Sequence, residues 1–333
     1  MSQEFIHLHV HSAYSLAEGA IPVKGLIKKV KSMGMAAVAV TDSGNLFGAM
    51  EFSLEAAKSG IQPILGARLP VGEQGHHLLF LVQNEAGYLN LSELITKSYL
   101  LSNGDSKPGI EWSWLQDHHD GLICLSGGFK GPIGQALLAR EPDKAQQILT
   151  QLISLFPGRL YIELQRHGLR EEEQIEEQLI ALAYDHNLPL VATNECYYPD
   201  ADFFEAHDAL LCIAEGRYIS EPDRVRVTPH HYLKSPQEMI ALFADIPEAV
   251  HNSVQIARRC SYFLGDVAPI LPPFQTESGL AEPEQIKIEA RKGLNWRLEN
   301  FVLNRAEIAE LDEVERDLLL KSYRDRLEFE LDI

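Results

Sequence analysis

The sequence predicts an α/β fold, because short aliphatic and β-branched runs alternate with helical patterns through the first 200 residues. Runs such as AAVAV are apolar at every position, as is typical of strands buried on both faces of a sheet. Seven segments have the composition of strands: residues 5–10, 36–41, 62–71, 77–83, 122–126, 160–165 and 188–193. A closed barrel and an open doubly wound sheet are both compatible with this pattern.

Three helices between these strands have recognisable start and stop signals. The first begins at Pro22, whose fixed φ favours a helix start, and ends at Gly34. The second is capped by Asn45 and ends at Gly60. The third repeats apolar residues through the 170s and stops near His186. Strands joined by helices of this length indicate a mostly parallel sheet.

One connection breaks the alternation of strands and helices. Only GEQG, residues 72–75, separates the third and fourth predicted strands, which is too short for a crossover helix. We therefore expect an antiparallel hairpin, which would bring His77 close to the end of the third strand.

Beyond residue 200 the pattern is helical. Apolar periodicity predicts helices over 202–214, 235–244, 247–258, 283–302 and 305–332. The proline-rich stretch APILPPFQTESG reads as a linker. We therefore divide the chain into a domain at 1–267, a linker at 268–282 and a helical segment at 283–333. The last helical pattern has no stop signal, so we expect the natural chain to continue beyond it.

Composition and charge exclude several classes of protein. The chain has 29 Lys and Arg against 48 Asp and Glu, a formal net charge of −19, which argues against a surface built to bind duplex DNA. No run of apolar residues is long enough to span a membrane, and no secretory signal is apparent. The four cysteines show no CxxC spacing, which fits reduced thiols in the cytoplasm. Phosphate loops, GxGxxG after a strand and GxSxG are all missing.

The N-terminal run FIHLHVHS places three histidines at alternate positions. In a strand, His7, His9 and His11 point to one face and the apolar residues between them to the other. Imidazoles gathered on one face suit a metal site or hydrogen bonds to carboxylates. A polar edge strand with solvated histidines is the alternative interpretation.

Further polar side chains follow predicted strands, where α/β proteins build their sites. In TDSGNLFG, Thr41 and Asp42 end a strand, although a capped turn into a helix is the better explanation of this segment taken alone. TNECYYPDADFFEAHD offers Glu195 and His207 as possible ligands. Three other candidates lie on or directly after strands: His77, Glu163 and His167.

Several motifs, taken together and in their order, resemble one family. They are HLHVHSAYSLAEGA, TDSGNLFGAMEF, GIQPILGARL, HLLFLVQNEAGYLNL, GLICLSGG, YIELQRHG and ATNECYY. The set resembles the PHP (polymerase and histidinol phosphatase) domain at the N-terminus of bacterial DNA polymerase III alpha subunits, and later motifs such as YLKSPQEM resemble the continuation of that subunit. The resemblance covers essentially the whole chain. It implies a distorted seven-stranded (βα) barrel of the PHP type with a metal cluster at the strand C-termini, followed by a helical extension toward the polymerase palm.

The resemblance also assigns the positions of a metal site. Five of them still carry a group that can donate to a metal: His7, His9, Glu18, His77 and Glu195. Four have lost the usual ligand: Ser43, Arg68, Gly128 and Tyr197. A guanidinium stays protonated at any relevant pH, so Arg68 would fill the space of the metal with positive charge. We expect it to pair with Glu18 or Glu195 and to replace the cation electrostatically.

The expected function is therefore that of a scaffold with a vestigial metal site and no catalytic residues of its own. The resemblance implies docking of the proofreading exonuclease (epsilon) subunit and contact with the polymerase core of the same chain. No Asp-x-Asp motif directly follows a predicted strand, so we expect no polymerase active site here; DNA and Mg²⁺ would be bound only by the full-length enzyme. We expect no tightly bound cofactor, with weak binding of zinc, manganese or magnesium left open. The alternatives are a metal-dependent phosphoesterase or 3′–5′ exonuclease that uses the residual cluster, and a freestanding enzyme similar to histidinol phosphatase.

Overall fold

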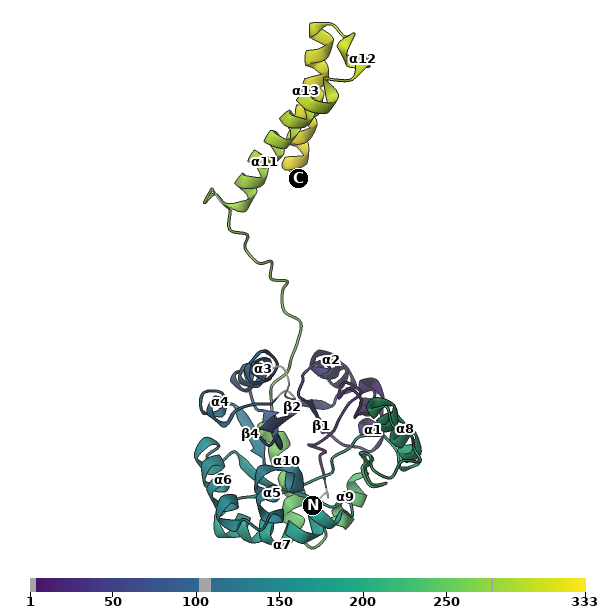
Figure 1. The fold of residues 1–333 in the computed structure, drawn as a ribbon, viewed down its shortest axis with the longest axis vertical. Coiled ribbons are helices and arrows are strands. Elements are labelled where there is room, and N and C mark those ends of the chain that lie inside the picture. Colours follow the sequence, from purple (N-terminus) through teal and green to yellow (C-terminus); the bar gives the residue numbers. More distant parts are fainter. Residues whose placement is uncertain (1–3, 102–108, 277) are drawn as a thin grey trace. The chain divides into compact units, whose positions relative to one another are not determined.

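The computed structural model describes residues 4–101, 109–276 and 278–333. The chain forms two compact units, Met1–Asp266 and Val267–Ile333. The first unit is an α/β fold and the second is helical (Figure 1). Residue 277 of the predicted linker lies outside the described residues.

The first unit is built on one curled sheet. Its strands are β1 (Ala37–Ser43), β2 (Gln62–Val71), β3 (His76–Val82), β4 (Leu122–Leu125), β5 (Leu160–Gln165) and β6 (Leu190–Thr193). Neighbours in sequence are neighbours in the sheet, from β1 to β6. Strand β3 runs antiparallel to both β2 and β4, whereas the other pairs are parallel. The hairpin expected around residues 72–75 is therefore present.

The predicted strand at 5–10 is not a regular member of this sheet. Its backbone hydrogen bonds go to two different partners. The N–H of Ala39 donates to the carbonyl of His7 (2.8 Å), and the N–H of Cys196 donates to the carbonyl of His9 (3.1 Å). The segment thus runs between β1 and the residues after β6 without forming a continuous ladder with either. Within the described residues the sheet is a six-stranded half-barrel, so the expectation of seven strands is corrected to six strands and one irregular segment.

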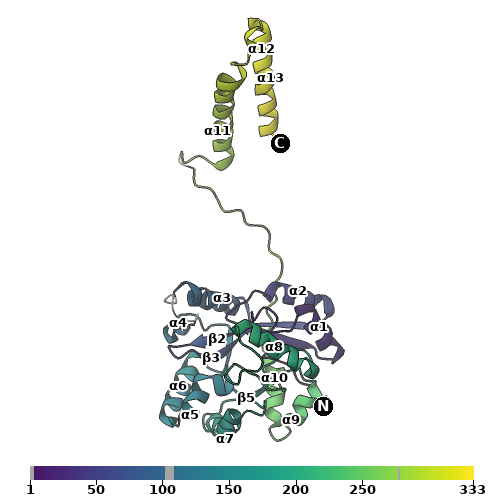
Figure 2. The same cartoon turned by 45° about the vertical axis from the view of Figure 1, so that its right-hand side comes forward.

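Helices surround the sheet (Figure 2). They are α1 (Val23–Ser32), α2 (Ala49–Ser59), α3 (Glu85–Leu100), α4 (Trp112–Asp117), α5 (Pro132–Leu138), α6 (Pro142–Leu155), α7 (Arg170–Asp185), α8 (Phe204–Glu215), α9 (Pro236–Leu242) and α10 (Pro247–Arg259), with single 3₁₀ turns at Gly128–Lys130 and Ala201–Phe203. Two predicted helix ends are confirmed: Pro22 is the N-cap of α1, and Gly60 ends α2 in the left-handed conformation that favours glycine. The other two are displaced, because the N-cap of α2 is Gly48 instead of Asn45 and the C-cap of α1 is Met33, one residue before Gly34.

The two faces of the sheet enter two different cores. In β1, Val38 and Val40 pack in the larger core beneath the outer helices, whereas Ala37 and Ala39 face the other way. The second core is closed by the N-terminal segment and by α10, which contributes Ile256. With both faces buried, β1 has the near-continuous apolar character seen in the sequence.

The second unit contains α11 (Glu282–Arg297), a π-helical turn (Leu298–Val302), α12 (Ala306–Ala309) and α13 (Glu313–Leu331). The single helix predicted over 305–332 is therefore interrupted. Asp312 is the reason, because its side chain accepts from the backbone N–H of Glu315 (2.8 Å) and starts a new helix. No helix of the described residues is long and apolar enough to cross a membrane.

Candidate functional site

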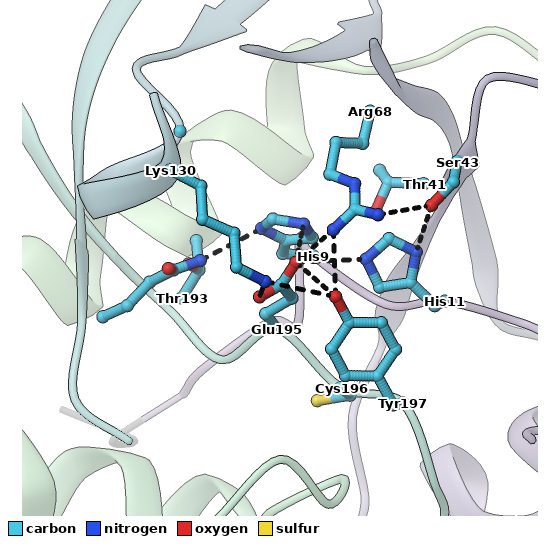
Figure 3. Close-up of polar contacts among 12 residues, drawn as sticks. His9, His11, Thr41, Ser43, Arg68, Lys130, Thr193, Glu195, Cys196 and Tyr197 are labelled. Atoms are coloured by element: carbon cyan, nitrogen blue, oxygen red, sulfur yellow. Dashed lines mark hydrogen bonds and ion pairs between the residues drawn. The ribbon is translucent and has the colours of Figure 1, made fainter. Parts of the chain in front are cut away.

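Polar side chains converge at the edge of the sheet where most strands end (Figure 3). Arg68 lies on β2, Lys130 follows β4, and Glu195 follows β6. Strand β3 runs the opposite way, so its beginning, with His77, lies at the same edge. The irregular N-terminal segment adds His9 and a second histidine.

Two histidines are held with one ring nitrogen free. His9 Nδ1 bonds Glu163 Oε1 (2.8 Å), a carboxylate that also accepts from Thr193 Oγ1 (2.6 Å). His11 Nδ1 bonds Ser15 Oγ (3.1 Å). Since a carboxylate only accepts hydrogen bonds, His9 carries its proton on Nδ1. The Nε2 atoms of both rings are buried without a hydrogen-bond partner among the described residues.

The free Nε2 atoms face one carboxylate. Glu195 Oε1 lies 3.8 Å from His9 Nε2 and 3.6 Å from His11 Nε2. One ligand atom from each of the three buried residues falls within 4.8 Å of the others. Two imidazoles and a carboxylate, oriented by outer hydrogen bonds, are a donor set that suits zinc and other transition metals.

Arg68 occupies the centre of this group. Its Nη1 donates to Glu195 Oε1 (2.5 Å) and to Tyr197 Oη (2.9 Å). Its Nη2 donates to Glu18 Oε2 and to Ser43 Oγ, both at 2.7 Å. Burial alone would lower the pKa of Arg68, but Tyr197, Glu195 and Glu18 raise it above its usual value. Arg68 was expected to pair with Glu18 or Glu195, and it pairs with both.

Lys130 brings a second cation that the sequence analysis missed. Its Nζ donates to Glu195 Oε2 (2.7 Å) and lies 3.4 Å from Tyr197 Oη. Burial would lower its pKa, but Glu195 raises it above the usual lysine value. The turn SGGFKG that carries Lys130 resembles no metal or catalytic motif, so only the folded chain shows that it points into the site.

The residues as they stand do not fit a metal ion. Burial would raise the pKa of Glu195, but Lys130, His11 and Arg68 together hold it well below its usual range. Both oxygens of that carboxylate are already bound by cations of the chain. The residues around the cluster leave no room for a water molecule, and a metal ion would stand against two fixed positive charges.

The other predicted site residues adopt different roles around Arg68. Glu18 is half-buried and accepts from Ser43 Oγ (2.6 Å) as well as from Arg68. His77 lines the same small space, but its Nδ1 has no hydrogen-bond partner in the described part of the chain, and burial lowers its pKa to about 3. Tyr197 stacks on His11, with ring centroids 4.6 Å apart, and donates to Glu195 Oε1 (2.7 Å).

Gly128 has a backbone conformation that disfavours any side chain. It has a φ of +56°, and a Cβ there would lie 2.8 Å from Gln165 Oε1. A side chain at this position, one of the four without the usual ligand, would therefore adopt a strained backbone and displace the end of Gln165.

The structure places His7 away from the cluster. Its Nε2 bonds the carbonyl of Lys234 (2.8 Å), and its ring packs edge-on against Phe5. His11 takes the place given to His7, so the histidine pair of the site is His9 and His11. Alternation in a strand put all three on one face, but the segment is irregular, and only two of its histidines face Glu195.

The remaining candidates have structural partners. Asp42 accepts from Ser12 and Ser15 and so fastens the loop after the N-terminal segment. His167 bonds the carboxylate of Glu172 (2.7 Å). His207 bonds the carbonyl of Glu18 (2.7 Å) and so holds the loop that presents Glu18 to Arg68.

Comparison with known proteins agrees with the resemblance seen in the sequence. Residues 7–167 match the model of the PHP domain family. The chain is 42% identical over 341 residues to DNA polymerase III subunit alpha of Caulobacter vibrioides, covering 99% of this chain and 29% of that protein. It is 38% identical over 339 residues to the subunit of the same name from Pseudomonas aeruginosa, covering 100% of this chain and 28% of that protein. An amidohydrolase structure from Chromobacterium violaceum aligns at 16% identity over 62% of this chain and 96% of that chain, with a TM-score of 0.43.

The chain thus spans less than a third of the length of these curated relatives, although it matches them from end to end of its own sequence. We conclude that residues 7–167 belong to the PHP domain family and that the whole chain is homologous to part of DNA polymerase III subunit alpha.

Proposed function

We propose that this chain is the N-terminal PHP region of a replicative DNA polymerase alpha subunit, and that its PHP domain is a structural module without metal-dependent hydrolase activity. The observation that carries the proposal is that Arg68 and Lys130 bind both oxygens of Glu195. Their charges neutralise the carboxylate that a metal would need.

The same ion pairs give the module a structural purpose. They connect β2, the turn after β4, the segment after β6 and the loop that carries Glu18, which are far apart in the sequence. A metal cluster would join the same segments through its ligands. In this chain, the side chains of Arg68 and Lys130 do so without a metal ion and without the chemistry that a metal would bring.

The partners that we propose are proteins. The module docks the proofreading exonuclease (epsilon) subunit and supports the polymerase core of the same chain. This rests on the relatives' identity as polymerase III alpha subunits and on the resemblance. The net charge of −19 supports contact with proteins in preference to duplex DNA, which the rest of the polymerase would bind together with Mg²⁺.

The alternative is a metal-dependent phosphoesterase or 3′–5′ exonuclease. One observation favours it, namely the preorganised donor set of His9, His11 and Glu195. It would require Glu195 to leave Arg68 and Lys130, and a charged buried carboxylate that gives up its partners must find others of equal strength.

Metal content and turnover discriminate between the two. The chain is purified without chelator, its Zn, Mn and Fe content is measured by elemental analysis, and hydrolysis of bis(p-nitrophenyl) phosphate is followed with added Mn²⁺ or Zn²⁺. We expect substoichiometric metal and no turnover above that of a His9→Ala variant. Two or more tightly bound ions, with turnover lost in His9→Ala, would establish the enzyme.

The docking claim has its own test. The purified chain and the proofreading exonuclease subunit of the same organism are mixed and separated by size-exclusion chromatography. We expect them to elute together. Separate elution would refute docking by this region and would leave the structural interpretation of the Arg68 cluster standing.

A further inference from the structure

Helix α1 carries a row of exposed lysines. Lys24, Lys28 and Lys31 follow one another by four and three residues, so they lie along one face of the helix. The opposite face is buried and includes Leu26 and Val30. Packing thus fixes the orientation of α1, and the row of lysines points outward.

These three lysines have no ion-pair partner within the part of the chain that the structure describes. The fourth lysine of the helix, Lys29, differs from them because it is bound to the carbonyl of Pro199 and to Asp200. Intramolecular ion pairs therefore do not explain why Lys24, Lys28 and Lys31 are present. Of the three, Lys31 alone lies in the last turn, where the helix dipole favours a cation.

The sequence around α1 is unusual for this chain. Between Glu18 and Asp42 there are four lysines and no acidic residue, although the chain as a whole has 48 acidic residues in 333. A positive face on a protein of net charge −19 concentrates its attraction for polyanions in one place.

We propose that this face of α1, defined by Lys24, Lys28 and Lys31, is a docking surface for an acidic helical segment of a partner protein. The inference goes beyond the proposed function and does not depend on it. The lysines extend over about 10 Å of helix axis. Carboxylates spaced four and three residues apart on a second helix have the same spacing, so each lysine can meet one of them.

Nucleic acid fits this surface less well. Proteins that bind duplex DNA through its backbone make about 6–10 phosphate contacts. Three lysines supply too few such contacts, and the negative charge of the rest of the chain repels the flanking phosphates. A short acidic segment needs no contacts beyond these three lysines.

The test uses the 333-residue chain and a labelled peptide. The probe is a fluorescein-labelled alanine-based helix of 15 residues with glutamates at positions i, i+4 and i+7; the same peptide with glutamines is the uncharged control. Binding is followed by fluorescence anisotropy at 50 and 200 mM NaCl. The test variant is Lys24→Glu/Lys28→Glu/Lys31→Glu.

The matched variant is Lys58→Glu/Lys144→Glu/Lys292→Glu, which changes the net charge equally at lysines that already pair with a glutamate three residues before them. We expect the α1 variant to bind the acidic peptide at least about tenfold more weakly than the unmodified chain, and the matched variant to bind it within about twofold. The uncharged peptide should not bind.

Three results would overturn the proposal. They are no binding of the acidic peptide by the unmodified chain, equal weakening in both variants, or tighter binding of a 15-nucleotide single strand than of the peptide. The circular dichroism spectrum of each variant shows whether the fold is retained. Because the substituted side chains are exposed, we expect no change in it.

Discussion

Two arginines in this chain each bind two carboxylates, but they do so in different surroundings. Arg68 binds Glu18 and Glu195 with a side chain that is 7% exposed, and Glu195 itself is 1% exposed. Arg166 binds Glu176 and Asp245 with a side chain that is 21% exposed, and Asp245 is 60% exposed. The chemistry is the same, but Glu195 is closed to water, whereas Asp245 and Glu18, which is 40% exposed, can be hydrated when the arginine is lost. The comparison therefore distinguishes a buried ion pair, whose loss should strongly lower stability, from a more exposed one, whose loss should cost little.

Loss of the arginine should have the largest effect in the buried cluster. In Arg68→Met, Glu18 and Glu195 lose a partner and Glu195 stays buried, so we expect the free energy of unfolding to fall by about 3 kcal/mol or more. The matched Arg166→Met variant should lose about 1 kcal/mol or less. Urea unfolding measured by Trp112 and Trp114 fluorescence, in a Trp296→Phe background that silences the second unit, compares them. Equal losses in the two variants would show that burial does not distinguish the clusters.

Loss of Lys130 should have a smaller effect than loss of Arg68. The side chain of Lys130 is half-buried, and Arg68 remains beside Glu195 when it is gone. We expect Lys130→Met to lower the free energy of unfolding by about 1–3 kcal/mol. The double variant should lose more than the sum of the two single losses, because Glu195 then has no cation. A double-mutant cycle by urea unfolding measures this coupling, and strict additivity would contradict the shared-carboxylate arrangement.

The dependence of stability on pH should come from buried histidines and not from the Arg68 cluster. Burial lowers the pKa of His167 to about 3, so between pH 6.5 and about 3 the unfolded chain binds a proton there that the folded chain does not. Stability should therefore fall as the pH drops through this window. The pKa of Glu195 is depressed in the folded chain. Its contribution to the free energy of unfolding is therefore fully present above about pH 4.5 and is lost only at lower pH.

This dependence is checked by urea unfolding at pH 7, 6, 5 and 4. The slope of the unfolding free energy against pH gives the number of protons taken up on unfolding. Between pH 6 and 4, a His167→Gln variant should take up fewer protons than the unmodified chain, by up to one. The difference between the unmodified chain and Arg68→Met should stay constant from pH 7 to 5. A difference that shrinks in that range would show that Glu195 takes up a proton there.

Salt should produce the smallest effect and should act on the exposed cluster alone. At 1 M NaCl the Debye length is about 3 Å, which screens exposed charges but not buried ones. We expect the coupling free energy of Arg166 with Asp245 to shrink toward zero and that of Arg68 with Glu195 to stay the same. Double-mutant cycles at 0.1 and 1 M NaCl measure both couplings. Equal loss of coupling at the two sites would contradict the burial of Arg68.

The sequence predicts the parts of this molecule that depend on local pattern and chain order. The strands and the hairpin at 72–75 follow from apolar runs and connection length, and the pairing of Arg68 with Glu18 and Glu195 follows from the charge of a guanidinium at a ligand position. The position of polar residues directly after predicted strands also indicates that the site lies at that edge of the sheet.

What the sequence does not predict depends on the three-dimensional path of irregular segments. His7 and His11 are equivalent in an ideal strand, but the shared hydrogen bonds of residues 5–11 turn only His9 and His11 toward Glu195. Lys130 lies on a 3₁₀ turn whose direction is set by packing, so no spacing rule assigns it to the site. The apolar periodicity continues through the break before α13 and therefore does not predict it, although Asp312 is a helix-capping residue.

The central claim is that two cations of the chain stand where a metal would bind, and thermal unfolding with and without metal tests it most directly. The melting temperature of the unmodified chain and of Arg68→Met/Lys130→Met is measured with chelator and with excess Zn²⁺ or Mn²⁺. We expect no shift for the unmodified chain and a rise of several degrees for the variant, in which His9, His11 and Glu195 are free to bind the ion. A metal-dependent rise of equal size in the unmodified chain would show that Arg68 and Lys130 do not replace the metal.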